Sequence, residues 1–239
     1  MFFDIHSHVL HKVDDGAKNL KESINLLKMM YSQGITHVLA TPHFYPQIDT
    51  LDGFLEKVGK NFQELQKECQ TQKVPNIYKG SEVFYYSGIS KASGLEKLTL
   101  GGSDYILIEP NFNKLGVGFQ KELLYFRDTL KITPIIAHLE RYRKVKGYKN
   151  LLKFIKQNNI LVQVNASSFL SFRHYFAIKK LVKMNIITFI GTDTHSIEHR
   201  PPQLSEALQI IEKRFGAEYK EKLICNSNEF LQKITQKGN

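Results

Sequence analysis

Two periodicities of apolar residues alternate along the chain. Short, mostly apolar runs of about four to eight residues are typical of buried strands, whereas apolar residues every three or four positions are typical of one helix face. The first apolar run surrounds Ile5. The others cover residues 35–40, 76–83, 104–109, 133–138, 160–165 and 186–191, so the pattern predicts seven strands.

Helical spacing fills most of the chain between these runs. Asn19 and Glu22 form a capping-box-like start for a helix over residues 20–33, and Gly34 is a typical helix end. Further helices are predicted around residues 54–65, 119–130, 151–155, 177–184, 204–215 and 217–224, with a short one near Phe230. Residues 85–102 show no clear period.

Strands that alternate with helices predict a parallel sheet with helices outside it. The chain has 239 residues, which fits a single domain over residues 1–239 with one large core. We therefore expect an α/β barrel, with an open doubly wound sheet as the alternative.

Histidines and acidic residues recur where the predicted strands end. His6 and His8 are two residues apart on the first strand and should point to the same face. The later strand ends carry His43, Glu82, Glu109, His138, Asp193 and His195. In a barrel these ends surround one mouth, whereas an open sheet would spread them along an edge, so their placement favours the barrel.

Together with Asp15, these residues supply five imidazoles and four carboxylates, with no cysteine among them. Such ligands favour Mn, Fe or Zn, and their number exceeds what one ion needs. Taken singly, each residue could instead have a structural role, as a hydrogen-bonded core histidine, a helix cap or part of a turn. The exceptions are Glu82 and Glu109, since buried acids are rare unless they are paired. The set as a whole predicts a cluster of two or three metal ions, which can activate water and bind phosphoryl oxygens.

Two arginines follow closely behind these candidate ligands. Arg141 lies three residues after His138, and Arg200 lies five residues after His195. Guanidinium groups match phosphate oxygens in bidentate geometry. Arg143 is so near Arg141 that the spacing leaves both open as the phosphate ligand, and a surface ion pair is the alternative role for each.

Other residues beside these motifs have less certain roles. Asp4 shares a strand face with His6, where it could orient an imidazole. Aromatic residues next to the motifs could receive an aromatic substrate ring or pack in the core: Phe44, Tyr45, Phe112 and Tyr142. The remaining histidines are expected to lie outside the site: His11, His37, His174 and His199.

Composition narrows the class of partner only slightly. The formal net charge of +10 suits an anionic partner, but the lysines are scattered, so nucleic acid is not expected. Cys69 and Cys225 lack metal-binding spacing and suggest reduced thiols in the cytoplasm. The N-terminus does not resemble a signal peptide, and no apolar run reaches about 18 residues, so we expect no insertion into a membrane.

The motifs resemble those of the PHP (polymerase and histidinol phosphatase) family. Within it, the chain is most similar to the manganese-dependent protein-tyrosine phosphatases of bacterial capsule and exopolysaccharide operons. The matching motifs follow one order from residue 3 to about residue 215: Asp4-Ile5-His6-Ser7-His8, Val13-Asp14-Asp15-Gly16, Ala40-Thr41-Pro42-His43, Gly80-Ser81-Glu82, Ile136-Ala137-His138-Leu139-Glu140-Arg141-Tyr142, Thr192-Asp193-Thr194-His195 and Arg200-Pro201-Pro202.

This resemblance implies a distorted seven-stranded (β/α)7 barrel, TIM-like, with three divalent ions, Mn²⁺ above all. It assigns His6, His8 and Asp193 to one ion, with Glu82 bridging to a second ion that Glu109 and His138 complete. It assigns Asp15, His43 and His195 to the third ion. Arg141 and Arg200 match the arginines that hold the substrate phosphate.

The resemblance also implies an activity, which is hydrolysis of phosphotyrosine by a metal-bridging hydroxide without a cysteine nucleophile. Its substrate would be a tyrosine autokinase that regulates polysaccharide synthesis. The alternatives on the same site are a phosphatase of histidinol phosphate or another small molecule. A nucleic-acid-processing domain and a metal-binding module without turnover are the alternatives of another class. The motifs identify no general acid, and they leave the oligomeric state open.

Overall fold

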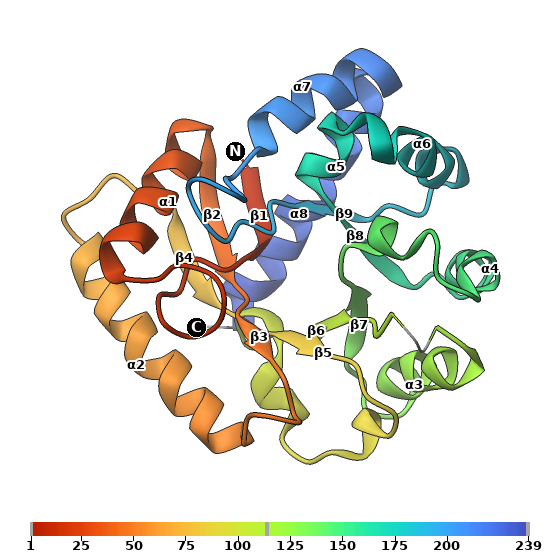
Figure 1. Cartoon of the computed structure of the whole chain (residues 1–239), viewed down its shortest axis with the longest axis horizontal. Helices are drawn as coiled ribbons and strands as arrows, with labels where there is room; N and C mark the ends of the chain where they lie inside the picture. The colour runs from red at the N-terminus through yellow and green to blue at the C-terminus, as the bar shows by residue number, and fades with distance from the viewer. Residues whose placement is uncertain (1, 113–114, 238–239) are drawn as a thin grey trace.

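Parallel strands form the centre of the protein, and helices surround them (Figure 1). The computed structural model describes residues 2–112 and 115–237. One sheet has the order β1-β2-β4, with β1 at Phe2–Ser7, β2 at Ile35–Ala40 and β4 at Asn76–Lys79. The other has the order β3-β5-β6-β7-β8-β9, with strands at His43–Phe44, Glu82–Phe84, Tyr105–Glu109, Thr133–Ile136, Leu161–Asn165 and Phe189–Gly191. The predicted α/β class with parallel strands is confirmed.

The structure has nine strands in the described residues where the pattern predicted seven. β3 is a two-residue strand after Pro42 that the apolar pattern does not mark. The predicted strand over residues 76–83 is divided into β4 and β5 at Gly80 and Ser81. At Gly80 the chain passes close to Leu100, since a Cβ there would lie 2.7 Å from Leu100 Cδ2. The two sheets approach each other where Ser7 pairs with Thr194.

The helices follow the predicted order. The α-helices are α1 (Leu20–Ser32), α2 (Leu51–Cys69), α3 (Val117–Asp128), α4 (Tyr148–Asn158), α5 (Ala166–Leu170), α6 (Tyr175–Met184), α7 (Leu204–Phe215) and α8 (Ala217–Lys237). The Asn19 side chain accepts a hydrogen bond from the backbone N–H of Glu22, as the capping pattern predicts. The irregular stretch contains three short 3-10 helices, Ile89–Lys91, Leu95–Leu98 and Leu100–Gly102.

The prediction of two final helices after residue 217 is wrong, because α8 is continuous. The polar triplet Asn226-Ser227-Asn228 suggests a break, but two of its side chains form hydrogen bonds in the continuous helix. Ser227 Oγ donates to the Leu223 carbonyl within the helix, and Asn226 Nδ2 donates to the Thr188 carbonyl.

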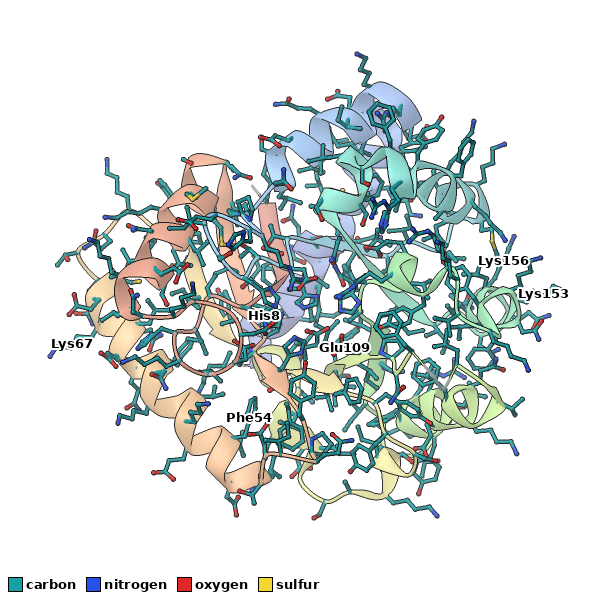
Figure 2. The ribbon with its side chains drawn as sticks, in the orientation of Figure 1. His8, Phe54, Lys67, Glu109, Lys153 and Lys156 are labelled. Atoms are coloured by element: carbon teal, nitrogen blue, oxygen red, sulfur yellow. The ribbon has the colours of Figure 1, made fainter. Side chains whose placement is uncertain are left out.

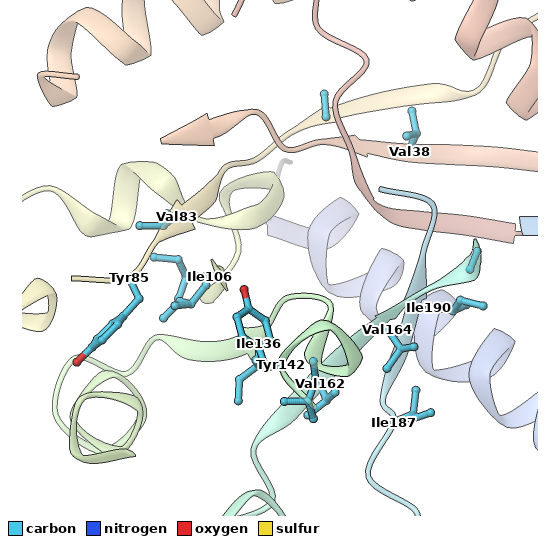
Figure 3. Close-up of a cluster of buried hydrophobic side chains, with 14 of the residues drawn as sticks. Val38, Val83, Tyr85, Ile106, Ile136, Tyr142, Val162, Val164, Ile187 and Ile190 are labelled. Atoms are coloured by element: carbon cyan, nitrogen blue, oxygen red, sulfur yellow. The ribbon is translucent and has the colours of Figure 1, made fainter. Parts of the chain in front are cut away.

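Two groups of buried side chains hold the layers together. The larger one packs the helices against the strands and includes Val83, Ile106, Ile136, Val162 and Ile190 (Figure 3). The smaller one joins α8 to inward-facing strand residues. In it the Phe230 ring packs against the rings of Phe3, Tyr105 and Phe189, with centroids 5.9, 4.8 and 5.4 Å away. α8 covers one end of the strands. The C-terminal ends of the strands lie at the opposite end, which α8 does not cover.

No helix in residues 2–112 and 115–237 combines the length and apolar character needed to cross a membrane.

Candidate metal centre

His6 and His8 meet at the end of β1, as predicted. Their Nε2 atoms are 3.1 Å apart, and both rings are fully buried. The pairing of β1 with β2 is irregular between Asp4 and Ser7, which interrupts strict alternation of side chains. Such bulges often redirect side chains beside active sites. Here Ile5 packs in the smaller core group while the neighbouring His6 faces the site.

Glu82 is the centre of the cluster. Its Oε2 lies 3.1 Å from His6 Nε2, 3.2 Å from His8 Nε2 and 3.1 Å from His43 Nδ1. Its Oε1 lies 2.7 Å from His138 Nε2, which is also 3.6 Å from Glu109 Oε1. One carboxylate therefore contacts four imidazoles from three separate parts of the chain, and His8 and Glu109 lie together near the centre of the molecule (Figure 2).

Asp15 and His195 extend the cluster toward solvent. Asp15 Oδ1 lies 3.5 Å from His195 Nε2 and 3.8 Å from His43 Nε2, and the Asp15 side chain is 70% exposed. All nine predicted ligands thus lie at one mouth. Three sets have donor atoms within 4.8 Å of one another: His8, Asp15, His43 and His195; His6, His8, Glu82 and Asp193; His43, Glu82 and Glu109.

Two of these residues follow their strands in the left-handed backbone region. His138 has φ 30° and Asp193 has φ 51°, conformations that cost energy for residues other than glycine. The Asp193 N–H donates to the His6 carbonyl, and the His138 N–H donates to Gln163 Oε1. These bonds hold both turns so that the side chains point into the mouth.

Both predicted arginines lie beside Asp193. Arg200 Nη2 is 2.5 Å and Arg141 Nη1 is 3.8 Å from Asp193 Oδ2. The two arginines line a cavity of about 420 Å³ with Asn165, Ser167, Ser168, Ser171 and His174. Arg143 is not part of that lining, so the geometry separates the two arginines that spacing could not. His174 was expected to lie outside the site, but it lines this cavity.

Two residues whose role the sequence pattern does not predict orient the imidazoles. Asp14 Oδ2 accepts from His8 Nδ1 at 2.6 Å and from the His43 N–H at 2.9 Å. Gln163 Oε1 accepts from His6 Nδ1 at 3.2 Å. Both bonds place the proton on Nδ1 and leave Nε2 free for a metal. A signal existed for each, since Asp14 is adjacent to a predicted ligand and Gln163 is a polar residue inside an apolar strand.

The interpretation of Asp4 as a residue that orients an imidazole is wrong. Its Oδ1 accepts from the backbone N–H groups of His6 and Thr192, and its Oδ2 accepts from Thr192 Oγ1. Asp4 therefore joins the ends of β1 and β9 through the backbone. Burial raises its pKa to about 6, while these bonds oppose the rise.

The aromatic residues beside the motifs divide between core and rim. Phe44 packs on Phe54 in the core, with ring centroids 5.1 Å apart. Tyr142 is buried and stacks on His138 at 6.0 Å, and Phe112 contacts it at 4.6 Å from a partly exposed position. Tyr45 stacks on His43 at 4.9 Å and is half-buried at the mouth.

Burial and neighbouring charges shift the pKa values within the cluster in both directions. Burial lowers the pKa of His43 to about 4, so this imidazole is neutral at neutral pH. Burial would raise the pKa of Glu82, but the surrounding imidazoles hold it well below its ordinary value. Burial and the Glu82 charge raise the pKa of Glu109 to about 8, as expected where two carboxylates share one site.

Buried donor atoms without partners show that the cluster fits divalent ions. His43 Nδ1 and His195 Nε2 are buried and form no hydrogen bond. Such atoms are rare, because each costs the desolvation of a polar group. Both belong to sets whose donor atoms converge, and nitrogen and carboxylate oxygen are the donors that Mn, Fe and Zn accept.

The fold and the site together define an α/β protein with a candidate multi-metal centre at the C-terminal ends of parallel strands. The chain belongs to the capsular polysaccharide synthesis family CpsB/CapC, whose model matches residues 2–232. This result confirms the family resemblance seen in the motifs.

Individual relatives match over nearly the whole chain. The tyrosine-protein phosphatase CpsB of Streptococcus agalactiae is 29% identical over 248 residues, covering 96% of this chain and 98% of the relative. The putative tyrosine-protein phosphatase CapC of Staphylococcus aureus is 33% identical over 225 residues, covering 91% and 86%. A crystal structure from work on YwqE of Bacillus subtilis and CpsB of Streptococcus pneumoniae, metal-dependent tyrosine phosphatases, superposes with a TM-score of 0.83 and 26% identity, covering 97% and 94%.

Proposed function

We propose that this protein is a metal-dependent protein-tyrosine phosphatase. The observation that carries the proposal is the position of Arg141 and Arg200, which line one cavity directly beside the cluster of imidazoles and carboxylates. A phosphate in that cavity meets two cations on one side and the candidate ligands on the other. The membership in the CpsB/CapC family and the similarity to named tyrosine phosphatases support the same activity.

The converging sets support a three-ion arrangement. In it, His6, His8 and Asp193 would hold one ion, Glu109 and His138 would hold a second, and Glu82 would be shared between the two. Asp15, His43 and His195 would hold the third. Mn²⁺ is the proposed ion, with Fe and Zn as alternatives. When bound, the ions would supply an activated water and neutralise charge on the phosphoryl oxygens.

The residues of the chain itself bind and orient the phosphate. Arg141 and Arg200 present planar donors that suit phosphate oxygens. Asp193 Oδ2 holds Arg200 in place and also accepts from Asn165 Nδ2 at 2.6 Å. His43 and His195 hold the outer edge of the site, where Asp15 is open to solvent. The cysteines play no part in this scheme, and both are free thiols.

The proposed substrate is a phosphotyrosine on a protein. A tyrosine autokinase that regulates capsule or exopolysaccharide synthesis is the specific substrate we propose, because the chain belongs to a family of capsular polysaccharide synthesis proteins. We propose a cytoplasmic location, which suits two unpaired cysteines.

Phosphate release from parallel substrates tests the activity. We expect Mn²⁺-dependent release from a phosphotyrosine peptide, with a higher kcat/KM than for histidinol phosphate. A higher kcat/KM for histidinol phosphate would be consistent with the proposed metal site but would contradict the proposed substrate. Turnover of single-stranded DNA without turnover of either phosphomonoester would contradict the proposal, as would metal binding with no hydrolysis.

A further inference from the structure

Two phenylalanines stand out from the surface next to the proposed phosphate cavity. Phe172 is 88% exposed and Phe176 is 80% exposed, four residues further along the chain. They belong to residues 171–176, which run from the end of α5 into the first turn of α6 and are called the rim segment below. Single exposed apolar residues are ordinary, but two large aromatic rings in one short segment are less so.

The rim segment is continuous with the cavity. Ser171 and His174, which alternate with the two phenylalanines, line the cavity together with Arg141 and Arg200. A phosphotyrosine held by the arginines would therefore bring its neighbouring residues to this segment. No other large hydrophobic residue among those described as exposed lies in a segment that lines this cavity.

The segment is held in place by polar contacts. His174 Nδ1 lies 3.4 Å from Ser168 Oγ, which donates to the buried Glu140 carboxylate at 2.8 Å. The Tyr175 ring lies under the Arg214 guanidinium at 5.4 Å and packs edge-on against Phe176 at 5.3 Å. Because its middle is anchored, the rim segment presents Phe172 and Phe176 from a defined position.

The surroundings of the segment favour an anionic peptide over a neutral apolar partner. Burial lowers the pKa of His174, and the nearby charges of Arg143, Arg173 and Arg141 lower it further. This concentration of positive charge suits a chain that carries a phosphate. An apolar partner without an anion would make no use of this positive charge.

We infer that Phe172 and Phe176 bind apolar side chains next to the phosphotyrosine of the protein substrate, so that this phosphatase selects peptides by the residues that flank the phosphate. The inference rests on the proposed function and adds a sequence preference to it. It predicts that flanking residues change substrate binding while the chemistry at phosphorus is unchanged.

Binding of fluorescent, non-hydrolysable phosphonate analogues of phosphotyrosine peptides tests the inference without requiring turnover. One peptide carries leucine or valine on both sides of the analogue, and the other carries glycine and serine. With the Mn²⁺-loaded protein, we expect the Phe172→Ala/Phe176→Ala variant to raise Kd for the apolar peptide about tenfold. Its Kd for the glycine-serine peptide, and kcat with p-nitrophenyl phosphate, should stay at the wild-type values. Tyr31→Ala, which removes an exposed aromatic ring at the end of α1, is the control.

Four results would overturn the inference. Equal binding of both peptides by the wild type, or an unchanged Kd in the double variant, would contradict it while leaving the proposed phosphatase activity intact. A parallel loss of p-nitrophenyl phosphate turnover would show that the rim segment shapes the phosphate cavity instead. If the wild type neither binds the analogue peptides nor releases phosphate from phosphotyrosine, the proposed function fails, and the inference fails with it.

Discussion

At the scale of single residues, Asp14 determines how His8 presents its metal-binding nitrogen. Its carboxylate accepts from His8 Nδ1 and from the N–H groups of Gly16 and His43. Burial would raise the pKa of Asp14, but the His8 charge and these hydrogen bonds hold it below its ordinary value. The carboxylate is therefore ionised and holds a proton on His8 Nδ1.

The Asp14→Asn variant replaces an acceptor with an amide that can turn a donor toward His8. We expect the affinity for Mn²⁺ to fall about 10- to 100-fold, the range for residues that orient a ligand from behind. Isothermal titration of the metal-free protein measures it, with Asp52→Asn at the start of α2 as the control. Wild-type affinity in Asp14→Asn would show that His8 needs no such support.

Arg141 and Arg143 differ in position by two residues but should differ strongly in function. Arg141 lines the cavity beside Asp193, whereas Arg143 does not line it. We expect Arg141→Ala to lower kcat/KM for p-nitrophenyl phosphate about 100-fold. The reason is that the variant loses a hydrogen-bond donor to the negative charge that develops in the transition state. Arg143→Ala serves as the matched control and should stay near the wild-type value. The opposite ranking would assign the phosphate contact to Arg143.

At the scale of elements, close packing between β9 and β1 sets the position of His6. A Cβ at Gly191 would lie 2.8 Å from His6 Cβ and 3.0 Å from Gln163 Nε2. Gly191→Ala must therefore displace His6, and we expect weaker Mn²⁺ binding and a loss of about 1–3 kcal/mol in the free energy of unfolding.

Gly59→Ala provides the comparison for that variant. Gly59 lies within α2, and a Cβ there would meet no atom within 4 Å. Because alanine is the better helix former, the substitution should stabilise the protein by about 0.5–1 kcal/mol. Urea denaturation measures both variants, and a stable Gly191→Ala protein with unchanged metal affinity would contradict the packing argument.

The continuous helix α8 closes the end of the protein opposite the site. Phe230 contributes three ring contacts to the smaller core group and is almost fully buried. We expect Phe230→Ala to reduce the free energy of unfolding by about 3–5 kcal/mol in urea denaturation. Gln232→Ala, on the exposed face of α8, should leave it nearly unchanged. Similar values for both variants would mean that α8 is not part of the core.

The ligand-type residues at strand ends could be predicted because each requires only a strand and its direction. His6, Glu109 and His138 lie where the apolar runs stop, and the structure brings them to one mouth. The hydrogen bonds that Asp14 and Gln163 accept could not be assigned from these residues' sequence signals alone, because the bonds join residues that meet only in the folded chain. The position of His174 in the cavity could not be predicted for the same reason, because three separate segments of the chain line that cavity.

Element boundaries were predicted less well where tertiary contacts override the local pattern. β3 is too short for a period, and its pairing with β5 comes from the approach of His43 to Glu82. α8 continues through a polar triplet, and the Thr188 carbonyl, in the loop before β9, accepts from Asn226. α5, with five residues, is likewise too short to be recognised from spacing.

At the scale of the whole molecule, ionisable side chains from separate parts of the chain lie together at one end of the strands. Glu82, Glu109 and Asp193 lie together in a buried mouth beside the imidazoles of His43, His138 and His195, whose pKa values are lowered by burial. Bound cations would neutralise these carboxylates. The proposed activity therefore depends on metal occupancy and not on one nucleophilic side chain.

Mn²⁺ titration of chelated protein, with bound ions and phosphate release from a phosphotyrosine peptide measured in the same samples, tests this account most directly. The account predicts that release is absent without metal, rises as ions bind and reaches its plateau when three ions per chain are bound. Release of phosphate from metal-free protein, or full occupancy by Mn²⁺ without any release, would contradict it.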